Sequence, residues 1–191
     1  MIDLCTNNFL TFVRLDNDER RANLKAMYNF YKNTCENYTH IFIEDDSECK
    51  IHDVIDLDKN DVSIFTKSDT EWRKGEGFNK AIKIAKSNIL TFLDTDIIIN
   101  PNQLNETKDL LNKDSKAGFI FPYNGLFLCA EKEVKDKFCE SLSLDDLVIP
   151  DKFKNYTGSR DKSLRDLYSL INNVYDGILV GHVASKGGCV M

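Results

Sequence analysis

The 191-residue sequence lacks the features that mark membrane, secreted and nucleic-acid-binding proteins. No apolar run approaches the ~20 residues that a membrane-spanning helix needs. The opening segment 1–4 has neither the basic nor the hydrophobic region of a signal peptide. Basic residues are in the minority, 25 Lys and Arg against 31 Asp and Glu, which argues against a broad nucleic-acid-binding surface. The six cysteines form no C-x-x-C pair, which is typical of reduced thiols, so we expect a cytoplasmic protein without a membrane span.

Interruptions of the chain are also few. It contains three prolines and neither an internal repeat nor a low-complexity tract. Its composition, 42% hydrophobic and 29% charged, is ordinary for a soluble globular protein. The length suits one domain with a sizeable core, so we expect a single domain over residues 1–191.

Apolar runs alternate with segments of helical periodicity through the first half of the chain. Strands are expected at 9–14, 40–43, 62–66 and 89–93, and helices at 18–33, 78–86 and 100–112. The second half predicts strands at 119–122, 126–130 and 178–184, helices at 131–142 and around 164–171, and an irregular polar segment at 145–160. Such alternation predicts an α/β fold with a mostly parallel sheet covered by helices on both faces. Ligands of these folds bind beyond the carboxyl ends of the strands.

Two carboxylates, Asp94 and Asp96, stand one residue apart inside the apolar run 90–99. An unpaired carboxylate is costly to bury, which places both residues where a strand gives way to a loop. Side chains two apart in an extended chain share a face, and two converging carboxylates are usually neutralised by a hard divalent cation. The alternative is that they cap the following helix, but Asn100, just before Pro101, already suits that role. We favour a metal–diphosphate site.

Other polar residues follow the predicted strands. Arg14 ends the first strand, and the acidic run at 44–46 ends the second, where a carboxylate could accept hydrogen bonds from a ribose or a base. A solvated turn is the alternative for this run. Before the helix at 78–86, Arg73 and Lys74 stand among glycines and are candidates for contacting a diphosphate, while Asn79 could contact a base or stabilise the loop. A flexible basic loop is the competing interpretation of this segment.

His182 follows the last predicted strand and precedes a pair of glycines. It could complete the coordination of the metal, although a single histidine is more often structural. Arg20, at the start of the first helix, is expected to pair with nearby acids.

The ordered set of these segments resembles the nucleotide-sugar-dependent glycosyltransferases of the GT-A fold, particularly the family 2-like group. The resemblance covers nearly the whole chain. Small viral members, including the first domain of multi-domain enzymes of large algal viruses, look closest in size. The matching segments are 9–14, 21–24, 41–44, 73–79, 81–85, Asp94-Thr95-Asp96, 121–123 and 187–188.

The resemblance implies a GT-A (Rossmann-like) fold in which residues 1–100 bind the nucleotide and residues 101–191 form an abbreviated acceptor side. Asp94 and Asp96 would hold Mn²⁺ or Mg²⁺ against the donor diphosphate, with Thr95 between them in the site, and Glu44 would contact a uridine-like group. The implied reaction transfers a hexose from a nucleotide diphosphate sugar, UDP-sugars being favoured, to a glycan acceptor, with inversion.

The chain departs from the family pattern after Gly188, where an acidic segment with the catalytic base is expected. Either the base comes from within the chain, or a further domain or partner chain supplies it. A nucleotide-sugar-binding domain without turnover therefore stays open as an alternative. A nucleotidyltransferase is a second alternative, but the glycine-rich loop it would carry near the N-terminus is missing from 5–16. The candidates for an internal base are Asp145, Asp146, Asp151 and Asp176.

Overall fold

The computed structural model of the chain describes residues 1–68, 72–113, 118–120, 122, 126–130, 132–146, 174–175 and 178–182, of which 126–129, 174–175 and 178–182 are described by their backbone alone. These residues divide into two compact units, with the boundary between Pro122 and Tyr123. The predicted division into nucleotide and acceptor halves near residue 100 concerns ligand roles and stays a prediction.

The first unit contains a four-stranded sheet with neighbours in the order β5-β4-β2-β6, all parallel. The α/β architecture with a parallel sheet and flanking helices is therefore confirmed. Two short strands, β1 and β3, pair with each other outside this sheet. The elements of the unit are β1 (Ile2–Asp3), β2 (Asn7–Val13), α1 (Asp18–Thr34), β3 (Cys35–Glu36), β4 (Thr39–Asp46), α2 (Ile51–Val54), β5 (Val62–Lys67), α3 (Lys74–Ile84), β6 (Ile89–Phe92) and α4 (Pro101–Lys113).

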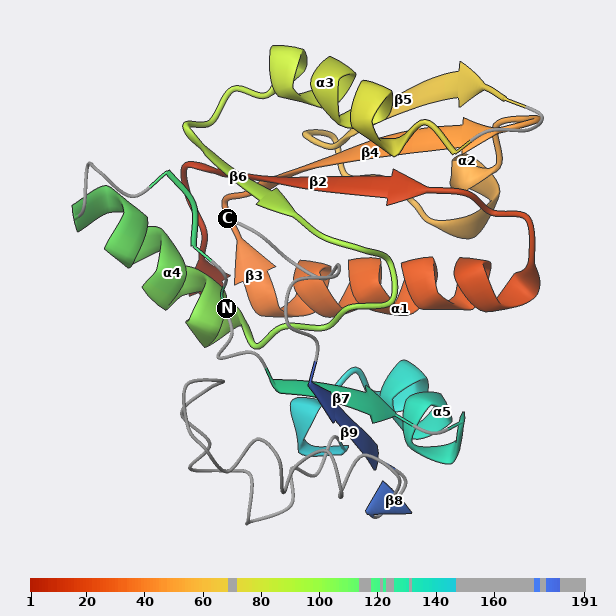
Figure 1. Cartoon of the computed structure of the whole chain (residues 1–191), viewed down its shortest axis with the longest axis vertical. Coiled ribbons are helices and arrows are strands. Elements are labelled where there is room, and N and C mark those ends of the chain that lie inside the picture. Colours follow the sequence, from red (N-terminus) through yellow and green to blue (C-terminus); the bar gives the residue numbers. More distant parts are fainter. Residues whose placement is uncertain are drawn as a thin grey trace. The chain divides into compact units, whose positions relative to one another are not determined.

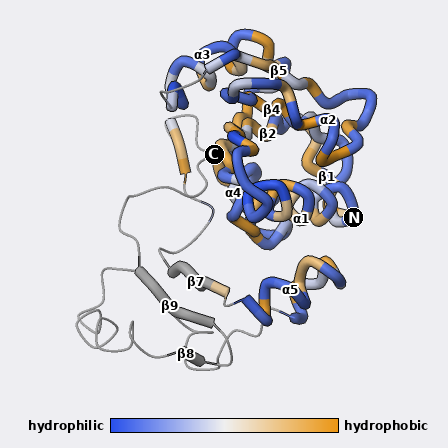
Figure 2. The backbone as a smooth tube through the Cα atoms, turned by 90° about the vertical axis from the view of Figure 1, so that its right-hand side faces the viewer, coloured by the Kyte–Doolittle hydropathy of each residue, from blue (hydrophilic) through white to orange (hydrophobic). Residues whose placement is uncertain are grey.

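Helices cover both faces of this sheet, with α3 on one face and α1 on the other (Figure 1). Hydrophobic residues follow the central strands β2 and β4 (Figure 2), because a parallel strand is buried on both faces. On the α1 face, Phe9 packs edge-on against Tyr31. The core of the α3 face consists of Leu10, Phe12, Ile41, Ile43 and Ala81.

Gly77 allows α3 to lie close to the sheet. A Cβ atom at this position would stand 2.7 Å from the Ile43 side chain and 2.7 Å from the Phe12 ring. Gly75, two residues earlier on the same helix, has nothing within 4 Å of its Cβ position. The Gly77 contact therefore sets the distance of the first turn of α3 from the strands.

Two helix starts agree with the capping signals in the sequence. The Asn17 side chain accepts a hydrogen bond from the backbone N–H of Arg20 at 2.9 Å, which caps α1. The Asn100 side chain accepts one from the backbone N–H of Asn102 at 2.9 Å, at the start of α4. The expected helix start at Asn100-Pro101 is confirmed.

The second unit contains a three-stranded antiparallel sheet with neighbours in the order β7-β9-β8. The predicted strand at 126–130 and the predicted helix at 131–142 are present. The strand expected at 178–184 is present up to His182, and the helix expected around 164–171 lies outside the described residues. The elements of the unit are β7 (Leu126–Ala130), α5 (Lys132–Ser141), the 3₁₀ helix η1 (Leu144–Asp146), β8 (Val174–Tyr175) and β9 (Ile178–His182).

Two predicted boundaries and one predicted strand were wrong. The acidic run at 44–46 does not end the second strand but belongs to it, because β4 keeps its pairing with β5 as far as Asp46. Helix α3 begins at Lys74 rather than Phe78, since the glycines are part of its first turn. The strand expected at 119–122 is absent from the described residues of that segment, where Phe119 is 63% exposed. Among the described residues, no helix combines the length and apolar character needed to cross a membrane.

Candidate active site

The carboxyl ends of the parallel strands carry the polar residues of the candidate site. Since β2, β4 and β6 run in the same direction, their carboxyl ends meet at one edge of the sheet. Arg14 follows β2, and Asp94 follows β6 by two residues. Asp45 lies near the carboxyl end of β4, where it pairs with Thr66 of β5. The predicted convergence of separate polar segments on one edge is therefore present.

Asp45 is held between two arginines. Its side chain is 2% exposed, and its carboxylate receives the guanidinium groups of Arg14 at 3.1 Å and Arg73 at 3.0 Å. Arg14 also donates through Nε to the backbone carbonyl of Asp45 at 2.8 Å, and the backbone N–H of Arg73 donates to the carboxylate at 3.2 Å. A buried carboxylate is stable only with such partners, so these contacts fix both arginines at the sheet edge.

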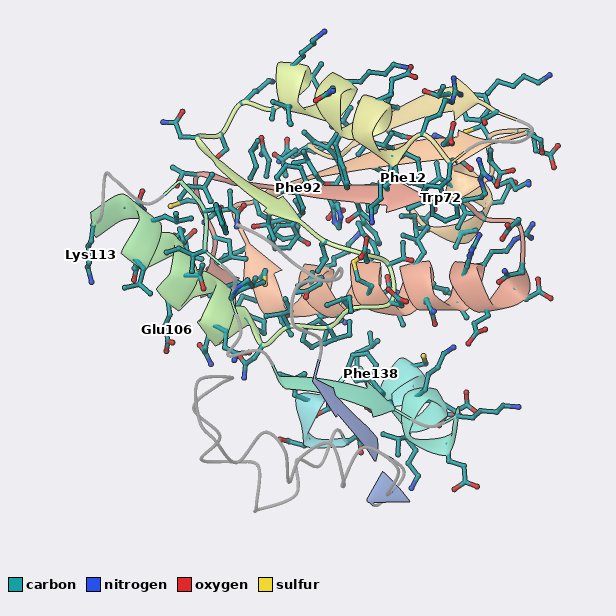
Figure 3. The ribbon with its side chains drawn as sticks, viewed as in Figure 1. Phe12, Trp72, Phe92, Glu106, Lys113 and Phe138 are labelled. Atoms are coloured by element: carbon teal, nitrogen blue, oxygen red, sulfur yellow. The ribbon has the colours of Figure 1, made fainter. Side chains whose placement is uncertain are left out.

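Trp72 stands beside this arginine–aspartate cluster. Its ring lies 5.7 Å from that of Phe12, and both are labelled in Figure 3. The guanidinium carbons of Arg14 and Arg20 lie 5.1 and 4.8 Å from the centre of the indole, within the range of cation–π attraction. Arg20 also pairs with Asp16 at 2.9 Å, which confirms its expected pairing with a nearby acid. Trp72 is 46% exposed and offers an aromatic surface at the site.

Lys74 contacts the other acidic segment. Its ammonium group forms an ion pair with the Asp94 carboxylate, and both side chains are partly accessible to solvent. Asp94 begins a turn in which the backbone N–H of Ile97 donates to the Asp94 carbonyl at 3.2 Å, with Thr95 and Asp96 at its tip. Asp96 is exposed. The two carboxylates thus lie in the turn that follows β6 rather than inside the sheet.

The start of α3 connects the two acidic segments, through Arg73 just before the helix and Lys74 as its first residue. Arg73 contacts Asp45 of β4, while its neighbour Lys74 contacts Asp94 beyond β6. In the sheet these strands lie on either side of β2, about 10 Å apart at ordinary strand spacing. The helix N-terminus, which favours anions, lies between them together with two cations. The arrangement suits an extended anion such as a nucleoside diphosphate.

Comparison with known protein families agrees with the resemblance to family 2-like glycosyltransferases seen in the sequence. The sequence model of the family described as glycosyl transferase family 2 matches residues 19–135. The chain belongs to this family. It is therefore a glycosyltransferase, whose family uses a nucleotide-sugar donor and an acceptor. A comparison with curated proteins returned no match.

The family match spans most of the elements that build the site. It begins in α1 and continues through β4, α3 and β6 to α5. Arg14 lies before it, whereas Asp45, Arg73, Lys74 and Asp94 lie within it. The nucleotidyltransferase alternative is set aside by the match.

Glu44 and Asp46 lie on the opposite face of the sheet from Asp45, because neighbouring side chains of a strand alternate. Glu44 is fully buried and accepts hydrogen bonds from the backbone N–H groups of Lys50 at 2.7 Å and Ile51 at 3.4 Å, at the start of α2. Burial raises the pKa of Asp46, but hydrogen bonds from Lys50, Ser47 and Leu15 outweigh this and hold its pKa below the ordinary value. Both acids therefore support the local structure, and Asp45 is the acid on the α3 face.

The described residues account for only some of the other predicted site residues. Asn79 lies on α3 with an exposed side chain, and its contact with a base stays a prediction. Asp145 and Asp146 lie in η1, in the second unit, where the Asp146 carboxylate accepts a hydrogen bond from Ser141. Asp151, Asp176 and the side chain of His182 lie outside the described residues, although the backbone of His182 pairs with Leu126 in the β7–β9 ladder.

The residues at Asp94 and Asp96 fit a hard divalent cation. Both supply carboxylate oxygens, the ligands that Mg²⁺ and Mn²⁺ prefer. In the described part of the chain, no group of three or more His, Cys, Asp or Glu side chains could hold a metal. A cation held by one or two carboxylates and completed by substrate phosphates matches this donor set.

The sequence singled out Glu44 as the nucleotide-contacting acid, a role that stays a prediction, and sequence reasoning missed Asp45 as the acid that contacts Arg14 and Arg73. The available signal was the alternation of the strand. Phe12, Ile43 and Arg14 share the face that α3 covers, and Asp45 continues the Ile43 row. That signal becomes usable only when the position of α3 is known.

Proposed function

We propose that this glycosyltransferase is a metal-dependent hexosyltransferase that takes a hexose from a nucleotide diphosphate sugar, with UDP-sugars favoured, and transfers it to a glycan with inversion. The observation that carries the proposal is the bridge made by the first turn of α3. Arg73 contacts Asp45 and Lys74 contacts Asp94 at the carboxyl edge of a parallel sheet.

The arginine–aspartate cluster suits the nucleoside side of the donor. A carboxylate has about four hydrogen-bonding positions, and three at Asp45 are taken by the Arg14 side chain and by the side chain and backbone N–H of Arg73. Since the Asp45 side chain is 2% exposed, a base or ribose would contact the more accessible side chains of the cluster, Arg73 at 34% and Trp72 at 46% exposed. The half-exposed Trp72 indole provides a face on which a base can stack.

The other end of the bridge suits the diphosphate. Lys74 and the N-terminus of α3 supply positive charge, and Asp94 and Asp96 would hold Mn²⁺ or Mg²⁺. Such a metal supplies charge neutralisation to the leaving nucleoside diphosphate. The chain's own residues hold the donor in one orientation, with its diphosphate across the ends of β2 and β6.

Turnover tests the proposal. The protein is incubated with Mn²⁺ and a panel of UDP- and GDP-sugars, and nucleotide release is measured with and without candidate glycans. We expect Mn²⁺-dependent release that rises with the right glycan and falls by about 10²-fold or more in Asp96→Ala. The matched control Asp58→Ala removes an exposed acid that precedes β5 and pairs with Lys32 of α1, and it keeps activity.

The anomeric configuration of the product tests inversion. We expect it to be opposite to that of the sugar in the donor. Donor binding without release, with any acceptor of the panel, would instead favour a nucleotide-sugar-binding domain without turnover. Release that does not depend on a divalent cation would contradict the metal assignment.

A further inference from the structure

Lys74 is held at the end of β6 by more than its ion pair. Its Nζ lies 5.8 Å from the centre of the Phe78 ring, one helical turn along α3. Phe78 packs edge-on against Phe92, the last residue of β6, with ring centres 5.0 Å apart. The ion pair with Asp94 is therefore supported by an aromatic contact between the same two elements.

In this ion pair the counterion of the Asp94 carboxylate is a side chain of the protein, Lys74, rather than a metal ion. A divalent cation on Asp94 and an ammonium group in contact with the same carboxylate would repel each other strongly at such short range. Lys74 must therefore leave Asp94 when a metal is held there. Its long, flexible side chain is 40% exposed and can make that movement.

Arg73 cannot easily take the place of Lys74. Its guanidinium group is committed to the Asp45 carboxylate at 3.0 Å and to the Lys67 carbonyl at 3.1 Å. Lys74 is thus the cation of the first turn that can change partners. The anion nearest to both Lys74 and the helix N-terminus in the proposed donor complex is the diphosphate.

We propose that Lys74 is a positioning residue that acts as an exchangeable counterion of Asp94. Without donor it pairs with Asp94 and lowers the affinity of the site for a free divalent cation. When the donor is bound, the Lys74 ammonium group pairs with the diphosphate instead, and the Asp94 carboxylate becomes available to the metal. This inference rests on the proposed function and adds to it a coupling between the two ligands, because each favours the arrangement that binds the other.

Binding of Mn²⁺ to the full chain tests the inference without turnover. Free Mn²⁺ is measured by electron paramagnetic resonance for wild type and Lys74→Met, each with and without UDP. We expect Lys74→Met to bind Mn²⁺ without UDP about three- to tenfold more tightly than wild type, the size expected for removing a partly exposed ion pair and its repulsion. The extra affinity that UDP confers on Mn²⁺ falls by a similar factor.

Lys80→Met is the matched control. Lys80 lies on the same helix with a similar exposure of 42%, but it pairs with Glu76 at 2.9 Å. We expect its Mn²⁺ affinity to equal that of wild type, and Lys74→Arg, which keeps the cation, to do the same. Equal tightening in Lys74→Met and Lys80→Met would show a general charge effect and overturn the inference.

Failure of the inference differs from failure of the proposed function. If wild type binds Mn²⁺ with UDP and Asp96→Ala does not, the metal site stands. An unchanged or weaker Mn²⁺ affinity of Lys74→Met without UDP then overturns the counterion role alone. If wild type binds no Mn²⁺ even with UDP, the metal assignment and the inference fall together.

Discussion

The close approach of α3 to the sheet predicts opposite effects for the same substitution at two glycines of one helix. In Gly77→Ala, the new methyl group would stand 2.7 Å from Ile43 and from Phe12, which are both buried. Overpacking of this kind costs about 3 kcal/mol at the upper end of its range. Replacing a helical glycine by alanine returns about 1 kcal/mol. We therefore expect Gly77→Ala to be destabilised by about 2 kcal/mol.

Gly75→Ala is the matched control, because nothing lies within 4 Å of its Cβ position. Only the gain in helix propensity acts there, so we expect stabilisation by up to about 1 kcal/mol. The two variants share the helix, the chemistry of the substitution and its effect on the unfolded chain. Their difference, about 3 kcal/mol, isolates the contact between α3 and the sheet.

Urea unfolding followed by tryptophan fluorescence measures this difference near the site, since Trp72 is the chain's single tryptophan and lies beside α3. In a thermal melt, 2 kcal/mol corresponds to a decrease of about 4–8 °C for a chain of this size. Equal stabilities of Gly75→Ala and Gly77→Ala would refute the close packing of α3. The positions of Arg73 and Lys74 at the two strand ends would then lose their support.

Three further predictions concern buried ionisable groups. Asp45→Ala leaves two arginines without their acid and is expected to lose about 2–3 kcal/mol of unfolding free energy in urea, against less than about 1 kcal/mol for the exposed Asp58→Ala. Burial lowers the pKa of His40 to about 3. The unfolded chain takes up a proton at His40 below pH 6.5 and the folded chain does not, so the free energy of unfolding should fall by up to about 1.4 kcal/mol per pH unit from pH 6.5 towards 3. His40→Gln should flatten this slope, whereas the same substitution at the exposed His52 should not. Burial raises the pKa of the Cys35 thiol to about 11, so a thiol reagent at pH 8 should modify it only as fast as the protein unfolds, while modification at the rate of exposed thiols would contradict its burial.

The order of the strands and helices in the first unit could be predicted because each element carries its own hydrophobic pattern. The stripe of Leu24, Met27 and Tyr31 predicts α1, and all three side chains are buried. The end of β4 could not be predicted in this way. Its last three residues are acidic, and they stay in the strand because of pairing with β5 and a separate partner for each carboxylate, which are long-range facts.

The site could be predicted as a set of residues but not as a set of contacts. Arg14 and Asp94 were expected at one edge of the sheet, and Arg73 and Lys74 were expected to contact a diphosphate. That Arg73 contacts Asp45 while its neighbour contacts Asp94 depends on where α3 packs, and residues 20 to 30 apart in sequence carry no local sign of it. The choice between Glu44 and Asp45 likewise depends on which face of β4 the helix covers.

The second unit could be predicted least. Its antiparallel β7–β9 pairing joins Leu126 to His182 across a long stretch of chain, and such pairing leaves little trace in local periodicity. The base candidates Asp145 and Asp146 lie together in η1. Their role stays a prediction, as does the coordination of a metal by His182.

In the proposed donor complex, a divalent cation and a nucleoside diphosphate are held together at the ends of β4 and β6. Paramagnetic broadening of backbone amide signals by Mn²⁺ in the presence of UDP locates the cation directly. We expect amides of 93–97 and of the first turn of α3 to lose intensity first, and Asp96→Ala to abolish the effect. Unchanged signals in these segments, with broadening centred instead on Asp145 and Asp146, would contradict a metal site at Asp94 and Asp96.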